Sequence, residues 1–212
     1  MEEQVQIIKK WLGTGSINIF GLPMSGKDTV GVRLAETIGG KFLSSGLIVR
    51  ALEKSTNQNV TGEGKLIPQN LFYDWVLPYF EKPELKQYPL VLSSIGRWSG
   101  EEDQVMSVAK LSEHPIRAVV MLQLSEQDAI ERWEAAKLLN DRGLRADDAN
   151  PEIFQTRINE YREKTVPVLK HYQELGLLVP VKASAPRDQV FTNVIEALAD
   201  FARRTNDFVA EL

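Results

Sequence analysis

The stretch SINIFGLPMSGKDTV, residues 16–30, combines a short apolar run, a glycine-containing turn and the start of an amphipathic helix. Four residues separate Gly21 from Gly26, and Lys27 follows directly, as in the phosphate-binding pattern Gly-x-x-x-x-Gly-Lys. The apolar run before the turn and the helical pattern after it are the context that such a loop requires. The stretch therefore predicts a P-loop at residues 21–29 within an α/β fold.

Each part of this loop has a physical role in binding phosphate. The glycines let the backbone curl so that successive N–H groups point inward. The following helix presents its positive N-terminal end to the same place, and Lys27 adds a full positive charge. Asp28 stands where the general pattern has Ser or Thr, and Thr29 follows it. The alternative interpretation is a strand-to-helix turn with an unrelated lysine.

Strand-like runs and helical patterns alternate along the rest of the chain. The runs lie at residues 17–20, 41–43, 89–95, 116–124 and 177–181, and the helical patterns at residues 27–38, 126–139, 151–175 and 186–203. Asn150 is the expected N-cap of the third of these helices, and Pro167 is expected to kink it. Pro180 marks the last run as an edge strand. The alternation predicts an α/β three-layer P-loop NTPase-type fold, with a five-stranded parallel sheet and helices on both faces.

Residues 1–16 precede the first predicted strand. Val5, Ile8 and Leu12 recur at helical spacing, which predicts a short amphipathic helix as an N-terminal extension. The segment has acidic residues first and no signal-peptide pattern. No apolar run approaches the ~18 residues that a membrane span needs. We therefore expect a single cytoplasmic domain over residues 1–212 with no membrane partner.

Composition excludes several classes of function. The chain of 212 residues has a formal net charge of −4, which argues against a nucleic-acid partner. It contains no cysteine, so disulfides, thiolate metal sites and a cysteine nucleophile are excluded. His114 and His171 match no metal-ligand spacing, and no residue is predicted to bind a metal directly.

Four blocks of the sequence resemble the adenylate kinase family of nucleoside monophosphate kinases, in its short-lid form. They are GLPMSGKDT (residues 21–29), LSSGLIVRA (43–51), VLSSIGRW (91–98) and LRADDANPEIFQTRINEYREKTVPVLKHYQELGLLVPV (144–181). The last block is the most specific, because it stays in register over some thirty residues. Together with Arg132 the blocks cover nearly all of residues 17–200.

The resemblance implies a phosphotransferase that moves the γ-phosphoryl of ATP to a nucleoside monophosphate, AMP by default, with Mg²⁺ as cofactor. It implies an acceptor-binding insertion at residues 44–75 and a short lid at residues 134–146. The implied catalytic residues are Lys27, Arg97, Arg132, Arg145 and Arg157. The implied ATP-binding residues are Gly21, Pro23, Ser25, Gly26, Lys27, Asp28, Thr29 and Arg132. The implied acceptor-binding residues are Ser45, Gly46, Arg50, Arg97, Gln104, Arg145 and Arg157. ATP and the monophosphate are the expected partners of a monomer.

The sequence also departs from the family. Leu47 and Ser93 stand where the family has Asp, and those carboxylates usually hold water around Mg²⁺. Asp28 replaces a glycine, and it could either supply the missing carboxylate or repel the nucleotide. Glu101 replaces a Gln of the acceptor-base pocket, and Trp98 beside it could stack on a base or pack in the core. Two alternatives therefore stay open, namely a catalytically impaired nucleotide-binding relative with a regulatory or scaffold role, and another P-loop kinase that acts on a small metabolite.

Overall fold

The computed structural model describes residues 1–57, 60, 61, 63–139 and 150–210. Its centre is one sheet of five parallel strands in the order β2-β3-β1-β4-β5. The strands are β1 (Ser16–Gly21), β2 (Lys41–Ser44), β3 (Leu90–Ser93), β4 (Ile116–Gln123) and β5 (Leu178–Lys182). The predicted five-stranded parallel sheet is confirmed, and Pro180 lies in the edge strand β5, where a residue without an N–H is tolerated.

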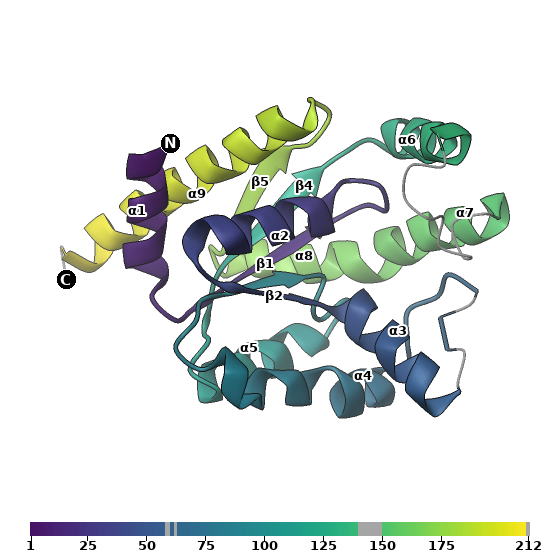
Figure 1. Ribbon diagram of the computed structural model, residues 1–212, viewed down its shortest axis with the longest axis horizontal. Helices are drawn as coiled ribbons and strands as arrows, with labels where there is room; N and C mark the ends of the chain where they lie inside the picture. Colours follow the sequence, from purple (N-terminus) through teal and green to yellow (C-terminus); the bar gives the residue numbers. More distant parts are fainter. Residues whose placement is uncertain (58–59, 62, 140–149, 211–212) are drawn as a thin grey trace.

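Helices lie before, between and after these strands (Figure 1). They are α1 (Glu2–Leu12), α2 (Lys27–Ile38), α3 (Ser45–Thr56), α4 (Gln69–Trp75), α5 (Glu101–Leu111), α6 (Glu126–Leu139), α7 (Pro151–Glu160), α8 (Val166–Glu174) and α9 (Arg187–Ala210). Two 3₁₀ turns, η1 (Leu77–Glu81) and η2 (Pro83–Leu85), follow α4. The sequence patterns predicted the spans of α2 and α6, whereas α3, α4 and α5 were missed.

The expected kink near Pro167 takes the form of a π-helical turn. Asn150 caps α7 by accepting a hydrogen bond from the Glu152 N–H at 2.8 Å. The π-helical turn η4 (Tyr161–Thr165) then separates α7 from α8, in which Pro167 occupies the first turn. A wider turn directly before a proline relieves the clash between its ring and the preceding carbonyl groups.

Two apolar layers cover the two faces of the sheet. On one face α1, α2 and α9 pack over Ile17 and Ile19 of β1 and over Val120 of β4. On the other face α3, α4, α5 and α8 pack over Phe20 and Leu90. Alternate residues of β1 thus enter opposite cores, and the central strand is buried along its whole length. The three-layer arrangement is confirmed (Figure 1).

The carboxyl ends of the parallel strands lie at one edge of the sheet. In Figure 1 the start of α2 and the helices α3, α6 and α7 all lie at this edge, on the right. Loops that leave parallel strands at the same edge are brought close together, so this edge is the natural place for a site. Among the helices in the described part of the chain, none is long and apolar enough to cross a membrane.

The N-terminal extension is integrated into the core. Helix α1 lies against α9, near the other end of the chain (Figure 1). Ile8 is fully buried, and the Trp11 ring meets Phe201 edge-on with centroids 5.8 Å apart. The helix therefore packs as part of the domain and adds to its buried apolar surface.

Truncating Ile8 tests this packing. Because the side chain is fully enclosed, Ile8→Ala should lower the free energy of unfolding by about 2–5 kcal/mol in urea denaturation. The half-buried neighbour Ile7 is the matched control, and Ile7→Ala should cost about 1 kcal/mol or less. Equal small effects of the two variants would show that α1 does not belong to the core.

Candidate functional site

The loop after β1 has the close packing of a phosphate cradle. A Cβ on Gly21 would lie 2.6 Å from Ser25 Oγ and 2.8 Å from the Leu122 carbonyl oxygen, so only glycine fits there. Gly26 has φ of 88°, a left-handed conformation that other residues adopt at a cost. Met24 has φ of 66° without being glycine. The loop is therefore held in a strained, pre-formed curl.

Lys27 begins helix α2 and reaches back across this loop. Its Nζ donates a hydrogen bond to the Leu22 carbonyl oxygen at 2.9 Å. The first N–H groups of α2 have no partner within their own helix, and they face the same side as the loop. The helix dipole and the lysine charge therefore add up at one point, where an anion is stabilised.

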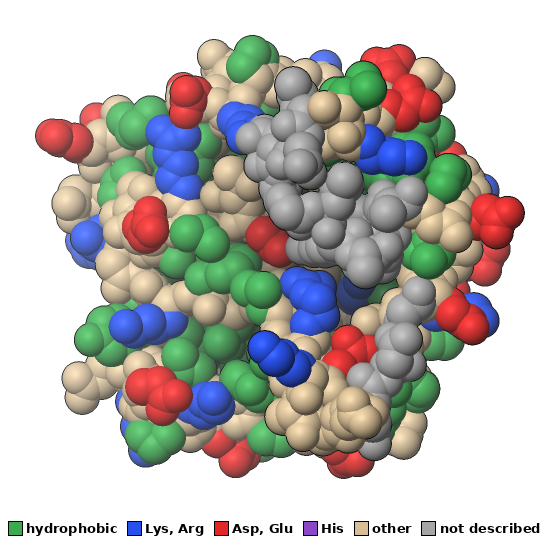
Figure 2. Space-filling model, turned by 45° about the vertical axis from the view of Figure 1, so that its right-hand side comes forward, with side chains coloured by type: hydrophobic (Ala, Val, Ile, Leu, Met, Phe, Trp, Pro, Cys, Tyr) green, Lys and Arg blue, Asp and Glu red, His purple; other side chains and the backbone are tan. Residues whose placement is uncertain are grey.

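A cavity of about 250 Å³ opens above the loop. Its basic side chains come from four separate segments: Lys27 from α2, Arg50 from α3, Arg97 from the loop after β3 and Arg157 from α7. Figure 2 shows Lys and Arg side chains gathered around a hollow in the middle of one face. Of the site residues predicted from the sequence, the cavity is lined by Pro23, Gly26, Lys27, Asp28, Thr29, Ser45, Gly46, Arg50, Arg97 and Arg157.

Arg97 shows how closely the positive charges are held. Its Nε is enclosed and has no hydrogen-bond partner among the described residues. Burial, and then the neighbouring Arg157, lower the pKa of Arg97 to about 10. Arg97 stays charged at neutral pH. The free-energy cost of holding its guanidinium group beside that of Arg157 would be offset by an anion bound between the two.

Asp28 faces the end of β3, the strand that pairs directly with β1. Its Oδ1 accepts a hydrogen bond from Ser93 Oγ at 2.6 Å, and both residues line the cavity. The carboxylate on this side of the cavity therefore comes from the first turn of α2, and the strand end contributes a hydroxyl. Ser93 also accepts, through its carbonyl oxygen, a long contact of 3.4 Å from Ser45 Oγ. Asp28 therefore lies at the wall of the cavity and leaves the curl of the loop open.

A second cavity of about 290 Å³ lies on the other side of the loop. Arg132 lines it and donates to the Ala183 carbonyl oxygen at 2.6 Å, while the Arg33 guanidinium covers the Phe191 ring at 4.1 Å from its centroid. Ser25 lines this cavity too, and its Oγ is buried without a hydrogen-bond partner in the described part of the chain. The apolar wall comes from α6, α9 and the segment before α9, which suits a flat heterocyclic ring.

A third recess of about 70 Å³ adjoins the first cavity on the side of α3. Trp98 and Glu101 line it. The indole Nε1 of Trp98 donates to the Ile67 carbonyl oxygen at 3.1 Å, and the Lys164 ammonium lies 3.9 Å from the Trp98 ring centroid. The ring is therefore fixed at the wall of the recess and is half-buried.

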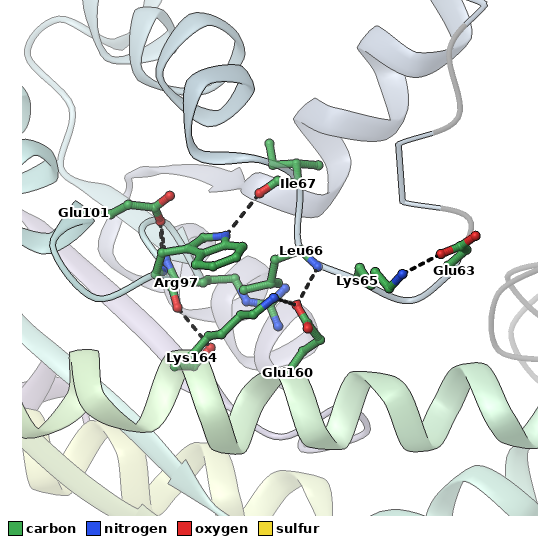
Figure 3. A network of polar contacts seen from close by, with 10 residues as sticks. Glu63, Lys65, Leu66, Ile67, Arg97, Glu101, Glu160 and Lys164 are labelled. Carbon is green, nitrogen blue, oxygen red and sulfur yellow. Dashed lines mark hydrogen bonds and ion pairs between the residues drawn. The ribbon is translucent and has the colours of Figure 1, made fainter.

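A polar network ties the segment 63–67 to the end of α7 and the π-helical turn (Figure 3). Glu160 accepts hydrogen bonds from the Leu66 N–H at 3.0 Å and from Lys164 Nζ at 2.6 Å. Figure 3 shows the first contact crossing from the helix to the segment that carries Ile67, while the second joins two side chains of the helix, four residues apart. Lys164 in turn covers the Trp98 ring, so the network supports one wall of the recess.

Some predicted residues lie elsewhere. Gln104 is exposed on α5 and lines none of the three cavities. Gly21 lies beneath the loop and shapes it without reaching the cavity. Arg145 and the lid residues after 139 lie outside the described residues.

Sequence reasoning missed the aromatic support of the site. Trp133 lines the first cavity and stacks on Phe154 of α7 with centroids 4.9 Å apart and planes 13° apart. Phe191 supports the second cavity. These residues belong to no motif, and only the apolar periodicity of their helices marked them as inward-facing.

The fold and the loop together define a class of protein. A five-stranded parallel sheet whose first strand enters a P-loop is the P-loop kinase type of fold. Among solved structures, a gluconokinase from Sinorhizobium meliloti 1021 superimposes with a TM-score of 0.61 at 20% identity, covering 91% of this chain and 96% of that one. At that identity the likeness establishes the fold.

The curated relatives point to one family within this class. The chain is 28% identical to an adenylate kinase of Chlamydia muridarum, covering 86% of each chain. It is 29% identical to an adenylate kinase of Agrobacterium fabrum and 26% identical to one of Methylobacterium nodulans, covering 86% of this chain and 96% and 94% of theirs. No family model matches the chain. The resemblance to adenylate kinases is confirmed over most of the length.

The clustered arginines predict a measurable response to a polyanion. Inorganic tripolyphosphate at a hundredfold excess over its Kd should stabilise the protein by about 2.7 kcal/mol in a thermal shift experiment. Arg97→Met should reduce this shift but leave the anion-free protein at least as stable, because it removes a buried charge beside Arg157.

The exposed Arg117 on β4 provides the control. Arg117→Met should keep the full shift. An undiminished shift in Arg97→Met would exclude Arg97 from the anion site.

Proposed function

We propose that this chain transfers the γ-phosphoryl group of ATP to a nucleoside monophosphate, with AMP as the default acceptor. One observation carries the proposal. The phosphate cavity joins two recesses of different character, sharing Gly26 and Thr29 with one and Ser45 and Arg97 with the other. Two nucleotides that meet through their phosphates need a phosphate site in the middle and a base site on either side. The three connected cavities have this arrangement.

The donor is assigned to the loop side. The N–H groups of residues 21–29 and Lys27 would hold the β- and γ-phosphates, as the loop pattern implies. The base would lie in the second cavity, between Phe191 and the aliphatic part of Arg132. Arg132 is fixed by main-chain carbonyl groups, at 2.6 Å to Ala183 and 3.4 Å to Met24, so its plane is set before any ligand arrives.

The acceptor is assigned to the α3 side. Arg50 and Arg97 would grip its phosphate, and Arg157 would lie between the two phosphates. Guanidinium groups match phosphate oxygens in pairs, and their charges neutralise the equatorial oxygens as the phosphoryl group moves. The protein needs no covalent intermediate for this step, because position and charge supply the rate.

The residues present fit a magnesium ion held through water. The Asp28 carboxylate, the Ser93 hydroxyl and the Thr29 side chain line the cavity beside the loop, and hard oxygen donors of this kind suit Mg²⁺. When bound, the ion would neutralise charge on the β- and γ-phosphates. Asp28 and Ser93 would order its water shell.

The second candidate is a catalytically impaired relative that binds nucleotide without turnover. Leu47 favours it, since this position carries a carboxylate in the family but here an apolar side chain that is 51% exposed at the start of α3. Asp28 weighs against it, because one carboxylate is restored beside the loop.

A coupled assay separates these candidates. With Mg²⁺ and ATP, at least one nucleoside monophosphate should be phosphorylated, and Lys27→Ala should lower kcat on the order of 10²–10³-fold because a charge contact of the transition state is lost. Lys170→Ala, at an exposed position on α8, is the control and should keep full activity. Nucleotide binding without turnover would instead support the impaired relative.

The pair of Asp28 and Ser93 gives a second test. Ser93→Asp would put a second carboxylate within hydrogen-bond distance of Asp28, and added ligand charge strengthens the binding of a divalent cation, so the single variant should need a lower Mg²⁺ concentration for half-maximal activity. The double variant Asp28→Ser/Ser93→Asp restores one carboxylate and one hydroxyl, and its Mg²⁺ requirement should return toward that of the wild type. A Mg²⁺ titration of activity that finds the single variant unaffected and the double variant dead would remove this pair from the metal site.

A further inference from the structure

Glu101, which lines the third recess, has one carboxyl oxygen without a hydrogen-bond partner among the described residues. Glu101 is 1% exposed, at the start of α5. Its Oε2 accepts hydrogen bonds from the Arg97 N–H at 2.7 Å and the Trp98 N–H at 3.0 Å. Its Oε1 is buried and accepts none from the part of the chain that the structure describes. A buried polar atom left in this way costs free energy, so a partner from a ligand would be favoured.

The recess that Glu101 lines has the composition of a base-binding site. Its apolar wall comes from Val49, Ile67 and Phe72, with the Trp98 ring beside them. At about 70 Å³ it takes the edge of a ring rather than a whole nucleotide. Glu101 is the one carboxyl group among its described lining residues. A flat ring whose edge donates hydrogen bonds is therefore the ligand that this recess suits.

The recess also lies at the right place for an acceptor. It shares Ser45, Gly46, Ser94 and Arg97 with the phosphate cavity. A nucleoside monophosphate whose phosphate meets Arg97 therefore has its base in this direction. Figure 3 shows Glu101 and Arg97 side by side, with Ile67 across from them.

We propose, on the premise of the phosphotransfer described above, that Glu101 reads the base edge of the acceptor, and that its ionised form selects guanine whereas its protonated form accepts adenine. An ionised carboxylate offers acceptors alone. The guanine edge presents N1–H and N2–H₂, which are donors, whereas the adenine edge pairs an N6–H₂ donor with the N1 acceptor. Only a protonated carboxyl or an amide offers the donor and acceptor that adenine needs.

Both forms of Glu101 are accessible near neutral pH. Burial is the main cause that raises the pKa of Glu101 to about 7, and the neighbouring carboxylate of Glu102 adds to it. The Arg97 and Trp98 N–H groups and the Arg97 charge act in the opposite direction. Lys65 faces the recess, and Tyr73 and Tyr172 interact electrostatically with Glu101 from α4 and α8. Burial raises the pKa of both tyrosines, which keeps them neutral here. The carboxyl is therefore protonated below about pH 7 and ionised above it.

The experiment compares acceptors across this range. The kcat/KM values of AMP, GMP, CMP and UMP are measured from about pH 5.5 to about pH 8.5, and the GMP to AMP ratio is followed. The acceptor phosphate also titrates near pH 6, but it does so alike in both nucleotides and cancels in the ratio. We expect the ratio to rise about tenfold with pH, the equivalent of one mismatched hydrogen bond. A ratio that does not change with pH in the wild type overturns the proposal.

Two variants sharpen the result. Glu101→Gln keeps the shape but offers one donor and one acceptor at every pH, so the ratio should become independent of pH and favour AMP. Glu102→Gln is the matched control, because Glu102 is buried next in the chain and accepts from the Gly100 N–H at 2.7 Å without lining the recess. It should keep the rise, with the midpoint moved to lower pH because the Glu102 charge no longer raises the pKa of Glu101. A rise that survives in Glu101→Gln assigns the titration to another group and overturns the proposal.

Failure of the reaction and failure of base reading have different outcomes. If no monophosphate is phosphorylated, the Kd values of AMP and GMP are measured by calorimetry at the two ends of the pH range. A Kd ratio that follows pH in the same direction would support base reading while contradicting phosphotransfer. Turnover with a constant ratio would support phosphotransfer while contradicting base reading, and the wild-type measurement needs no variant to fold.

Discussion

The parallel direction of the five strands is the constraint on which the rest of the site depends. The strands β1, β2 and β3 end at Gly21, Ser44 and Ser93, and the register places Ser44 opposite Ser93. Each chain segment must leave the sheet at the same edge. The P-loop, the start of α3 and the loop that carries Arg97 therefore meet there, although long stretches of sequence separate them.

Buried positive charge is costly at this edge of the sheet. Burial, and then the like charge of Arg157, lower the pKa of Arg97, because both disfavour its charged form. Positive φ angles at Met24 (66°) and Ser94 (53°) add local backbone cost within the same cavity. The two apolar layers supply the stability that keeps these groups in place. A bound polyanion would neutralise the buried arginine charges and so offset their free-energy cost, as expected of a phosphate-binding site.

Two carboxyl groups distinguish the walls of the cavities. Asp28, in the first turn of α2, meets Ser93 at the end of β3 at 2.6 Å beside the loop. Glu101 lines the third recess, whose Trp98 wall is supported by Lys164 of the π-helical turn and, through Leu66, by Glu160 at the end of α7. The proposed roles of these two carboxyl groups follow from the surroundings that the fold gives them.

The sequence by itself determined the scaffold and the loop. The spacing of Gly21, Gly26 and Lys27 and the alternation of apolar runs are local patterns, and they fixed the P-loop, the five strands and the long helices α2 and α6. The helices α3, α4 and α5 were missed. Helix α4 has only seven residues, which is too few for a helical pattern to stand out along the chain.

Only the tertiary structure decided how the side chains combine. Asp28 and Ser93 are 65 positions apart, so their contact follows from strand order and not from any pattern along the chain. Glu101 faces the recess while Gln104, one helical turn later, faces water, and the orientation of α5 on the sheet decides between them. Neighbours in space decide whether a charged group is buried, paired or left without a hydrogen-bond partner. Local patterns along the sequence do not contain that information.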